Sequence, residues 1–269
     1  MKLGISTYSY MWSIGFDGSW PDKPMTAVDL LAKAVELGVR VVQFGTNLPL
    51  ERLSNAELED FIQTAQRLEL ELELGTRGLD VNHISRQLEL GQRSGARLLR
   101  TVPEINGQTP AVAEIPFRLE RLLPQLEKAK IVLAVENGLI PVRDLKRVLN
   151  DVGSPLVGVV LDTVNSLAVS EGWKQVTQTL APYTMCLHYK DFCIRRVPSL
   201  MGFVVEGTPA GRGQLETGWL LEQLKASPYD FNVILELWPP EQPELADTVL
   251  LEQRWAVESI RYLRQHIGG

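Results

Sequence analysis

Short hydrophobic runs recur along the chain, and longer amphipathic segments separate them. The runs are rich in valine, isoleucine and leucine and end near glycine, proline, asparagine or aspartate. Apolar runs of this length between turn residues predict buried β-strands. We expect strands at residues 2–7, 40–44, 70–75, 97–102, 131–137, 156–163, 184–191 and 232–238.

The intervening segments have the periodicity of helices, with apolar residues at positions i, i+3, i+4 and i+7. Ser54 followed by Glu57 is a capping box at the start of one of them. Pro124 lies inside another, so we expect that helix to be kinked or to start late. The predicted helices cover residues 26–38, 54–70, 83–96, 115–129, 142–152, 173–183, 217–227 and 249–266.

Eight strands that alternate with eight helices predict a parallel sheet with helices on its outside. This number of units in 269 residues is typical of a single (β/α)8 barrel, and we assign residues 1–269 to one such domain. A doubly wound open sheet would call for a glycine-rich phosphate turn after an early strand. The residues after the first predicted strand read STYSYMW and contain no glycine, which favours the barrel.

Composition and charge narrow the possible partners and cellular locations of the protein. The net charge of −6 disfavours a nucleic-acid partner, because phosphates require a basic surface. We find no signal peptide and no apolar stretch of roughly 18 residues, so a membrane location is not expected. The two cysteines need not form a disulfide in a chain of this size, and we expect a cytoplasmic protein.

Four consecutive predicted strands end in a residue that can bind a metal. In a barrel of this kind, active-site groups lie at the carboxyl ends of the strands. A lone carboxylate there is often a helix cap, but three converging carboxylates repel one another unless a cation is present. One imidazole with three carboxylates suits Mn²⁺, Mg²⁺ or Co²⁺. The four expected ligands are Glu136, Asp162, His188 and Glu236.

This arrangement resembles the xylose isomerase-like TIM barrel superfamily, in particular its sugar isomerase and epimerase branch with the tagatose and allulose 3-epimerases. The stretches that carry the resemblance are VEN (135–137), LDTVN (161–165), HYKD (188–191), EGTPAGRGQL (206–215) and LEL (235–237). The resemblance implies one divalent metal ion held by the four ligands, a small sugar or sugar-like substrate, and a homodimer or homotetramer.

It also implies a reaction. Glu136 and Glu236 would act as the acid/base pair on opposite faces of a carbon next to a carbonyl. The metal would stabilise the enediolate formed when the proton leaves. We therefore expect a metal-dependent keto-sugar isomerase or epimerase. Tagatose-type epimerases have a histidine where this chain has Asn165, which weighs against the 3-epimerase assignment but leaves the metal site intact.

Further residues near the strand ends are candidates for binding the substrate. Arg77 and Arg212 could bind a carboxylate or phosphate, or could form surface ion pairs. Lys190 is two residues after His188 and could stabilise an oxyanion or pair with Asp191. The aromatic candidates are Tyr8, Trp12 and Trp238, and the Asn165 amide could hydrogen-bond a sugar hydroxyl. Gln43 and Asn137 also lie at strand ends.

Three alternative functions remain. A lyase or dehydratase acting on a keto-sugar or keto-cyclitol begins with the same proton abstraction and cannot be separated from an isomerase by sequence. A phosphodiesterase of the endonuclease IV type would need more histidines at strand ends. A catalytically inactive sugar-binding barrel would not need four intact ligands. The long apolar segment 192–215 is expected to fold over the pocket as a lid or to contact a neighbouring subunit.

Overall fold

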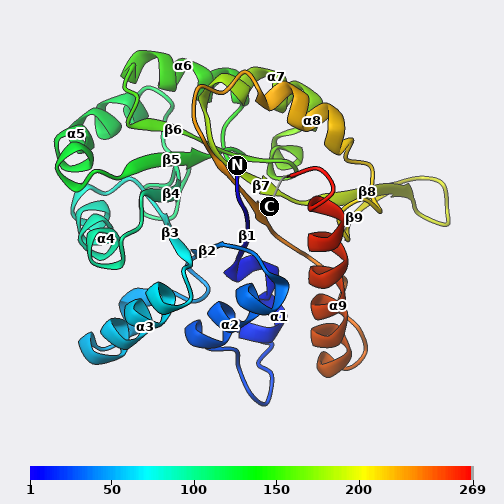
Figure 1. Cartoon of the computed structure of the whole chain (residues 1–269). Coiled ribbons are helices and arrows are strands. Elements are labelled where there is room, and N and C mark those ends of the chain that lie inside the picture. Colours follow the sequence, from blue (N-terminus) through cyan, green and yellow to red (C-terminus); the bar gives the residue numbers. More distant parts are fainter. Residues whose placement is uncertain (268–269) are drawn as a thin grey trace.

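Eight parallel strands close into a barrel in the computed structural model, which describes residues 1–267 (Figure 1). Their order around the barrel is β1-β10-β7-β6-β5-β4-β3-β2. Each predicted strand is present, and the single (β/α)8 barrel is confirmed. The barrel strands are β1 (Leu3–Ser6), β2 (Val41–Phe44), β3 (Glu71–Arg77), β4 (Leu98–Val102), β5 (Val132–Glu136), β6 (Val157–Asp162), β7 (Thr184–Tyr189) and β10 (Asn232–Leu235).

Helices surround the barrel, two after the first strand and one after each of the other barrel strands (Figure 1). They are α1 (Met11–Ile14), α2 (Ala27–Leu37), α3 (Asn55–Arg67), α4 (Val81–Ser94), α5 (Glu114–Ala129), α6 (Val142–Val152), α7 (Trp173–Leu180), α8 (Thr217–Leu224) and α9 (Leu245–Leu263). Short 3₁₀ turns are η1 (Thr7–Ser9), η2 (Leu50–Arg52), η3 (Asn165–Val169) and η4 (Ala181–Tyr183). The eight predicted helices correspond to α2 through α9.

The helix ends follow from local sequence. At the start of α3, the Ser54 hydroxyl accepts a hydrogen bond from the Glu57 amide at 3.3 Å, and the Glu57 carboxylate accepts one from the Ser54 amide. Pro124 lies inside α5, which already begins at Glu114. Of the two expectations, the late start is therefore wrong and the kink stays a prediction. The helix continues through the proline despite the missing amide donor.

The barrel interior is layered. Seven buried apolar or sulfur-containing side chains form one cluster inside it, contributed by strands β2, β4, β5, β6, β7 and β10: Val41, Leu98, Ala134, Val160, Met185, Cys186 and Ile234. Polar and charged side chains fill the interior toward the carboxyl ends of the strands, which is unusual for buried positions and requires compensating partners.

Segment 191–208 forms an antiparallel hairpin made of β8 (Asp191–Arg196) and β9 (Phe203–Thr208), where the sequence predicted a loop. Figure 1 shows it projecting beyond the helices that surround the barrel. Its tip exposes large apolar side chains, with Met201 90% and Phe203 65% accessible.

Asp191 holds the base of this hairpin together. Its carboxylate accepts hydrogen bonds from the amides of Phe192, Gly211, Gly213 and Leu215 at 2.8 to 3.1 Å. A Cβ at Gly213 would lie 2.2 Å from Asp191 Oδ1, so only glycine permits this approach. The segment therefore leaves and rejoins the barrel at one point.

Within residues 1–267, no helix combines the length and the apolar character needed to span a membrane.

Candidate metal centre and substrate pocket

Four neighbouring strands bring the predicted ligands together at the carboxyl end of the barrel. Glu136 ends β5, Asp162 ends β6, His188 lies in β7, and Glu236 directly follows β10. All four are buried, with at most 3% of any of them accessible. His188 and Asp162 are register partners on adjacent strands, which places their side chains at the same height.

The His188 Nδ1 atom faces oxygens from all three carboxylates. It lies 3.4 Å from Glu236 Oε1, 3.7 Å from Glu136 Oε2 and 3.9 Å from Asp162 Oδ2. Ligand atoms of Glu136, Asp162 and His188 all lie within 4.8 Å of one another. Among residues 1–267, His188 Nδ1 is buried without a hydrogen-bond partner. An unpartnered imidazole nitrogen facing three carboxylates fits a divalent cation held by nitrogen and oxygen ligands.

Two cations, one buried and one partly buried, balance much of this negative charge. Arg100 from β4 forms an ion pair with Glu136. Lys190 Nζ lies 2.8 Å from Asp162 Oδ2 and 2.9 Å from Glu236 Oε2. Lys190 therefore sits between two of the expected metal ligands.

The pKa values reflect these contacts. Burial alone would raise the pKa of Glu236, but His188, Lys190 and Arg100 outweigh it and lower the pKa to about 2. Burial likewise opposes the charge on Lys190, yet the carboxylates around it raise its pKa well above the usual range. Asp162 differs, because burial dominates and its pKa is raised. The two cations thus stay charged beside ionised glutamates.

Further polar groups orient the carboxylates. The Ser6 hydroxyl donates a hydrogen bond to Glu236 Oε1 at 3.1 Å, and Asn165 Nδ2 donates one to Glu136 Oε1 at 2.6 Å. Gly138 has φ +124° and lies so close to Asn165 that a Cβ there would be 2.6 Å from the Asn165 Cβ. A glycine is therefore needed for Asn165 to reach Glu136.

A pocket of about 290 Å³ opens above this cluster. It contains four of the seven residues that the sequence predicted to bind substrate, namely Tyr8, Arg77, Asn165 and Lys190. Arg100 also lines it, and sequence reasoning missed this residue because it lies within an apolar strand rather than at its end. An arginine inside an otherwise apolar run was the available signal.

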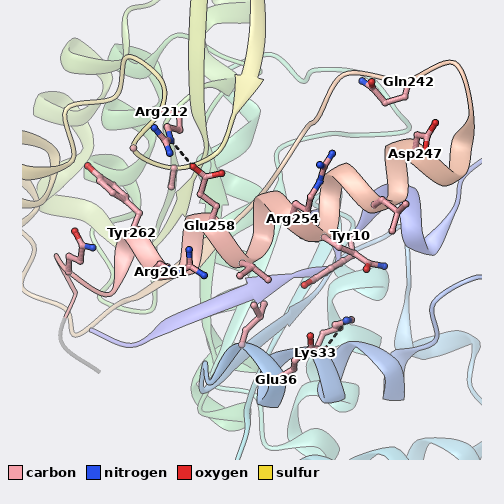
Figure 2. A pocket seen from close by; sticks show the side chains of 17 residues that line it. Tyr10, Lys33, Glu36, Arg212, Gln242, Asp247, Arg254, Glu258, Arg261 and Tyr262 are labelled. Carbon is pink, nitrogen blue, oxygen red and sulfur yellow. Dashed lines mark hydrogen bonds and ion pairs between the residues drawn. The ribbon is translucent and has the colours of Figure 1, made fainter.

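The structure places the other three predicted binding residues elsewhere. Trp12 packs edge-on against Phe16 with ring centroids 5.1 Å apart. Trp238 covers the hairpin backbone at Gly207. Arg212 forms an ion pair with Glu258 of α9 at 2.6 Å, in a cavity of about 1150 Å³ on the outside of the barrel (Figure 2). Although larger, this cavity is lined by residues of α2, α9 and adjoining loops and by none of the four predicted ligands.

The hairpin residues that the sequence analysis considered as a lid do not line the 290 Å³ pocket in the described part of the chain.

Comparisons with known proteins agree with this architecture. Residues 31–266 match the family model described as xylose isomerase-like TIM barrel. The chain is 32% identical to 3-oxo-isoapionate decarboxylase of Pectobacterium atrosepticum over 264 residues, which is 98% of this chain and 95% of that protein.

Two solved structures share the fold. A D-psicose 3-epimerase from Clostridium cellulolyticum H10, solved with D-tagatose, has a TM-score of 0.72 at 15% identity, covering 98% of this chain and 99% of that chain. A xylose isomerase-like protein from Mycobacterium smegmatis, solved with magnesium, has a TM-score of 0.70 at 15% identity, covering 96% and 97%. The chain therefore belongs to the xylose isomerase-like TIM barrel family, as an enzyme with a buried site for a divalent metal.

Proposed function

We propose that this enzyme decarboxylates a 3-oxo sugar acid with the help of one divalent metal ion. The observation that carries the proposal is a group of three cationic side chains on one pocket: Arg77, which forms an ion pair with Glu104, Arg100 and Lys190 all line 290 Å³ beside the carboxylate cluster. A neutral keto-sugar requires no such group of cations, whereas a substrate carboxylate binds well to arginine. The similarity to a 3-oxo-isoapionate decarboxylase supports the same substrate class.

The proposed ligands are Glu136, Asp162, His188 and Glu236, whose buried oxygens and unpartnered nitrogen suit Mn²⁺, Mg²⁺ or Co²⁺. A divalent ion held there would supply Lewis-acid stabilisation of negative charge on a substrate oxygen.

The protein groups perform the remaining steps. Arg77 and Arg100 orient the substrate carboxylate, and the bond between that carboxylate and the neighbouring carbon breaks. Carbon dioxide leaves, and the electron pair moves toward the 3-oxo group as an enolate. Lys190 keeps a proton at Nζ, 2.9 Å from Glu236 Oε2. Lys190 gives this proton to the carbon that lost carbon dioxide, directly or through Glu236, and regains a proton from solvent. Water cannot reach the site through the barrel from the amino ends of the strands, because the barrel interior is filled with side chains.

A sugar isomerase or epimerase is the second candidate. It is favoured by the position of Glu136 and Glu236, which both border the pocket and come from β5 and from the end of β10. Two carboxylates of this kind could remove a proton from one face of a carbon and return it to the other.

One experiment separates the two reactions. The purified protein with Mn²⁺ is incubated in D₂O either with a 3-oxo sugar acid or with neutral ketoses such as D-psicose, and followed by NMR. Carbon dioxide release with one deuterium at the carbon that lost it supports the decarboxylase. Deuterium exchange and an epimer from a neutral ketose support the epimerase, and the absence of bound metal would contradict both. Glu236→Gln should abolish turnover and leave the fold intact, whereas full turnover by this variant would contradict its role.

A further inference from the structure

A chain of hydrogen bonds inside the barrel connects the proposed metal ligand His188 to a buried glutamate that does not border the pocket. His188 Nε2 lies 2.8 Å from Gln43 Oε1, on β2. The Gln43 amide nitrogen donates to Glu73 Oε2, on β3, at 3.0 Å. Gln43 and Glu73 are register partners on adjacent strands, so the barrel itself fixes this pair.

The hydrogen-bond partners of Glu73 in the described part of the chain are all donors. Asn232 Nδ2 donates to Glu73 Oε1 at 2.8 Å, and the Cys186 thiol lies 3.8 Å from Glu73 Oε2. Glu73 is 5% accessible, and burial raises its pKa while the hydrogen bonds from Asn232 and Gln43 oppose that rise. A carboxylate can accept hydrogen bonds from all three neighbours, and it has no need to donate one.

The orientation of the Gln43 amide follows from this arrangement. Its NH₂ group must point at Glu73, so its oxygen must point at His188. An amide oxygen only accepts, and therefore the hydrogen of the neutral imidazole must be on Nε2. The lone pair of a neutral ring is then on Nδ1, the nitrogen that faces Glu136, Asp162 and Glu236.

We propose that Glu73, acting through Gln43, is a positioning residue that fixes His188 with its hydrogen on Nε2 and so keeps Nδ1 available to the metal. The inference rests on the metal site of the proposed function, although the state of the imidazole can be measured without metal or substrate. Partners of this kind commonly orient metal-binding histidines, and their loss typically weakens metal binding about 10- to 100-fold.

Glu73→Gln tests the proposal. The new amide would place an NH₂ group among donors unless Gln43 or Asn232 turned over. A turned Gln43 amide would offer its NH₂ group to His188 Nε2. The ring hydrogen would move to Nδ1, where it competes with the metal. We expect the Kd for Mn²⁺, measured by chelator competition, to rise about 10- to 100-fold.

Long-range ¹H–¹⁵N NMR of the metal-free protein, above the ordinary pKa of histidine, reads the ring directly. The chain has three histidines, so the signals are few. We expect hydrogen on Nε2 of His188 in the wild type and on Nδ1 in Glu73→Gln. Glu252→Gln is the matched control, since Glu252 is equally buried but lies on α9 and contacts Ser13 and Trp12. It should change neither the ring nor the Kd.

The wild-type spectrum alone can overturn the proposal, whether or not a variant folds. A neutral ring with its hydrogen on Nδ1, or any ring state that Glu73→Gln leaves unchanged, would show that Glu73 does not set it. Gln43→Leu is a second variant, which should remove the preference for Nε2. If the wild type binds no Mn²⁺ but shows the expected ring, the proposed function fails and the positioning by Glu73 stands.

Discussion

Lys190→Met should destabilise the metal-free protein and, at the same time, tighten metal binding. Lys190 Nζ is 2.8 Å from Asp162 Oδ2 and 2.9 Å from Glu236 Oε2, and only 17% of its side chain is accessible. At an effective dielectric constant of about 20, two unit charges roughly 4 Å apart attract by about 4 kcal/mol. Removing one partner of a buried ion pair costs about 3–5 kcal/mol because the other charge stays buried.

The metal and the ammonium group would compete for the same two carboxylates, and Asp162 Oδ2 faces both Lys190 Nζ and His188 Nδ1. Without Lys190 the metal no longer has to displace a cation, and we expect its Kd to fall at least roughly tenfold, which corresponds to about 1.4 kcal/mol. Urea unfolding in the presence of a chelator measures the first effect, and Mn²⁺ titration against a fluorescent chelator measures the second. Neither measurement depends on the reaction that the enzyme catalyses.

The control is Lys174→Met, which removes an exposed lysine paired with Glu216. Exposed pairs contribute about 0–1 kcal/mol, so this variant should match the wild type in both assays. Weaker or unchanged Mn²⁺ binding by Lys190→Met would refute the competition, and unchanged stability in chelator would refute the electrostatic argument.

Three further predictions concern other parts of the chain. Arg77→Met should raise KM about tenfold for an anionic substrate, since a charge-assisted contact contributes about 1.5–3 kcal/mol. Arg212→Met should not change KM, and equal effects of the two variants would show that Arg77 does not bind the substrate. Burial raises the pKa of Glu252 from 4.5 to about 7, so its contribution to stability is present below pH 4.5 and is lost as the pH rises through 7. Urea unfolding should show the wild type losing about 3 kcal/mol relative to Glu252→Gln across that range, and a constant difference would contradict the assignment. Gly213→Ala should lower the unfolding free energy by about 1–3 kcal/mol, because its Cβ would collide with Asp191; an unchanged urea midpoint would mean that the loop relaxes freely.

Much of the fold could be read from periodicity. Parallel strands buried on both faces appear in the sequence as continuous apolar runs, and the helices outside them as amphipathic segments. The proposed metal ligands could be predicted for a related reason, because barrel geometry brings the carboxyl ends of the strands together. Their positions along the chain were therefore enough to predict that four side chains lie close together: Glu136, Asp162, His188 and Glu236.

The direction of side chains that lie beyond the strand ends could not be predicted in this way. The Trp12 ring packs on Phe16, and the Arg212 side chain, which follows β9, forms an ion pair with Glu258 of α9. Arg100 was missed for a different reason, because it lies inside an apolar strand rather than at the strand end, where the candidates were expected. Pairing with Glu136 is what makes its burial tolerable, and a partner on another strand is invisible in one segment of sequence.

The hydrogen bonds around Asp191 have a consequence for how such a protein can change over time. Because the hairpin leaves and rejoins at one carboxylate, its length and tip can be altered without transmitting a shift to His188, three residues upstream. The hairpin can therefore vary while the barrel strands that carry the proposed metal ligands stay the same. New contacts can be acquired at residues 194–205 while the strand that carries the imidazole stays under an independent constraint.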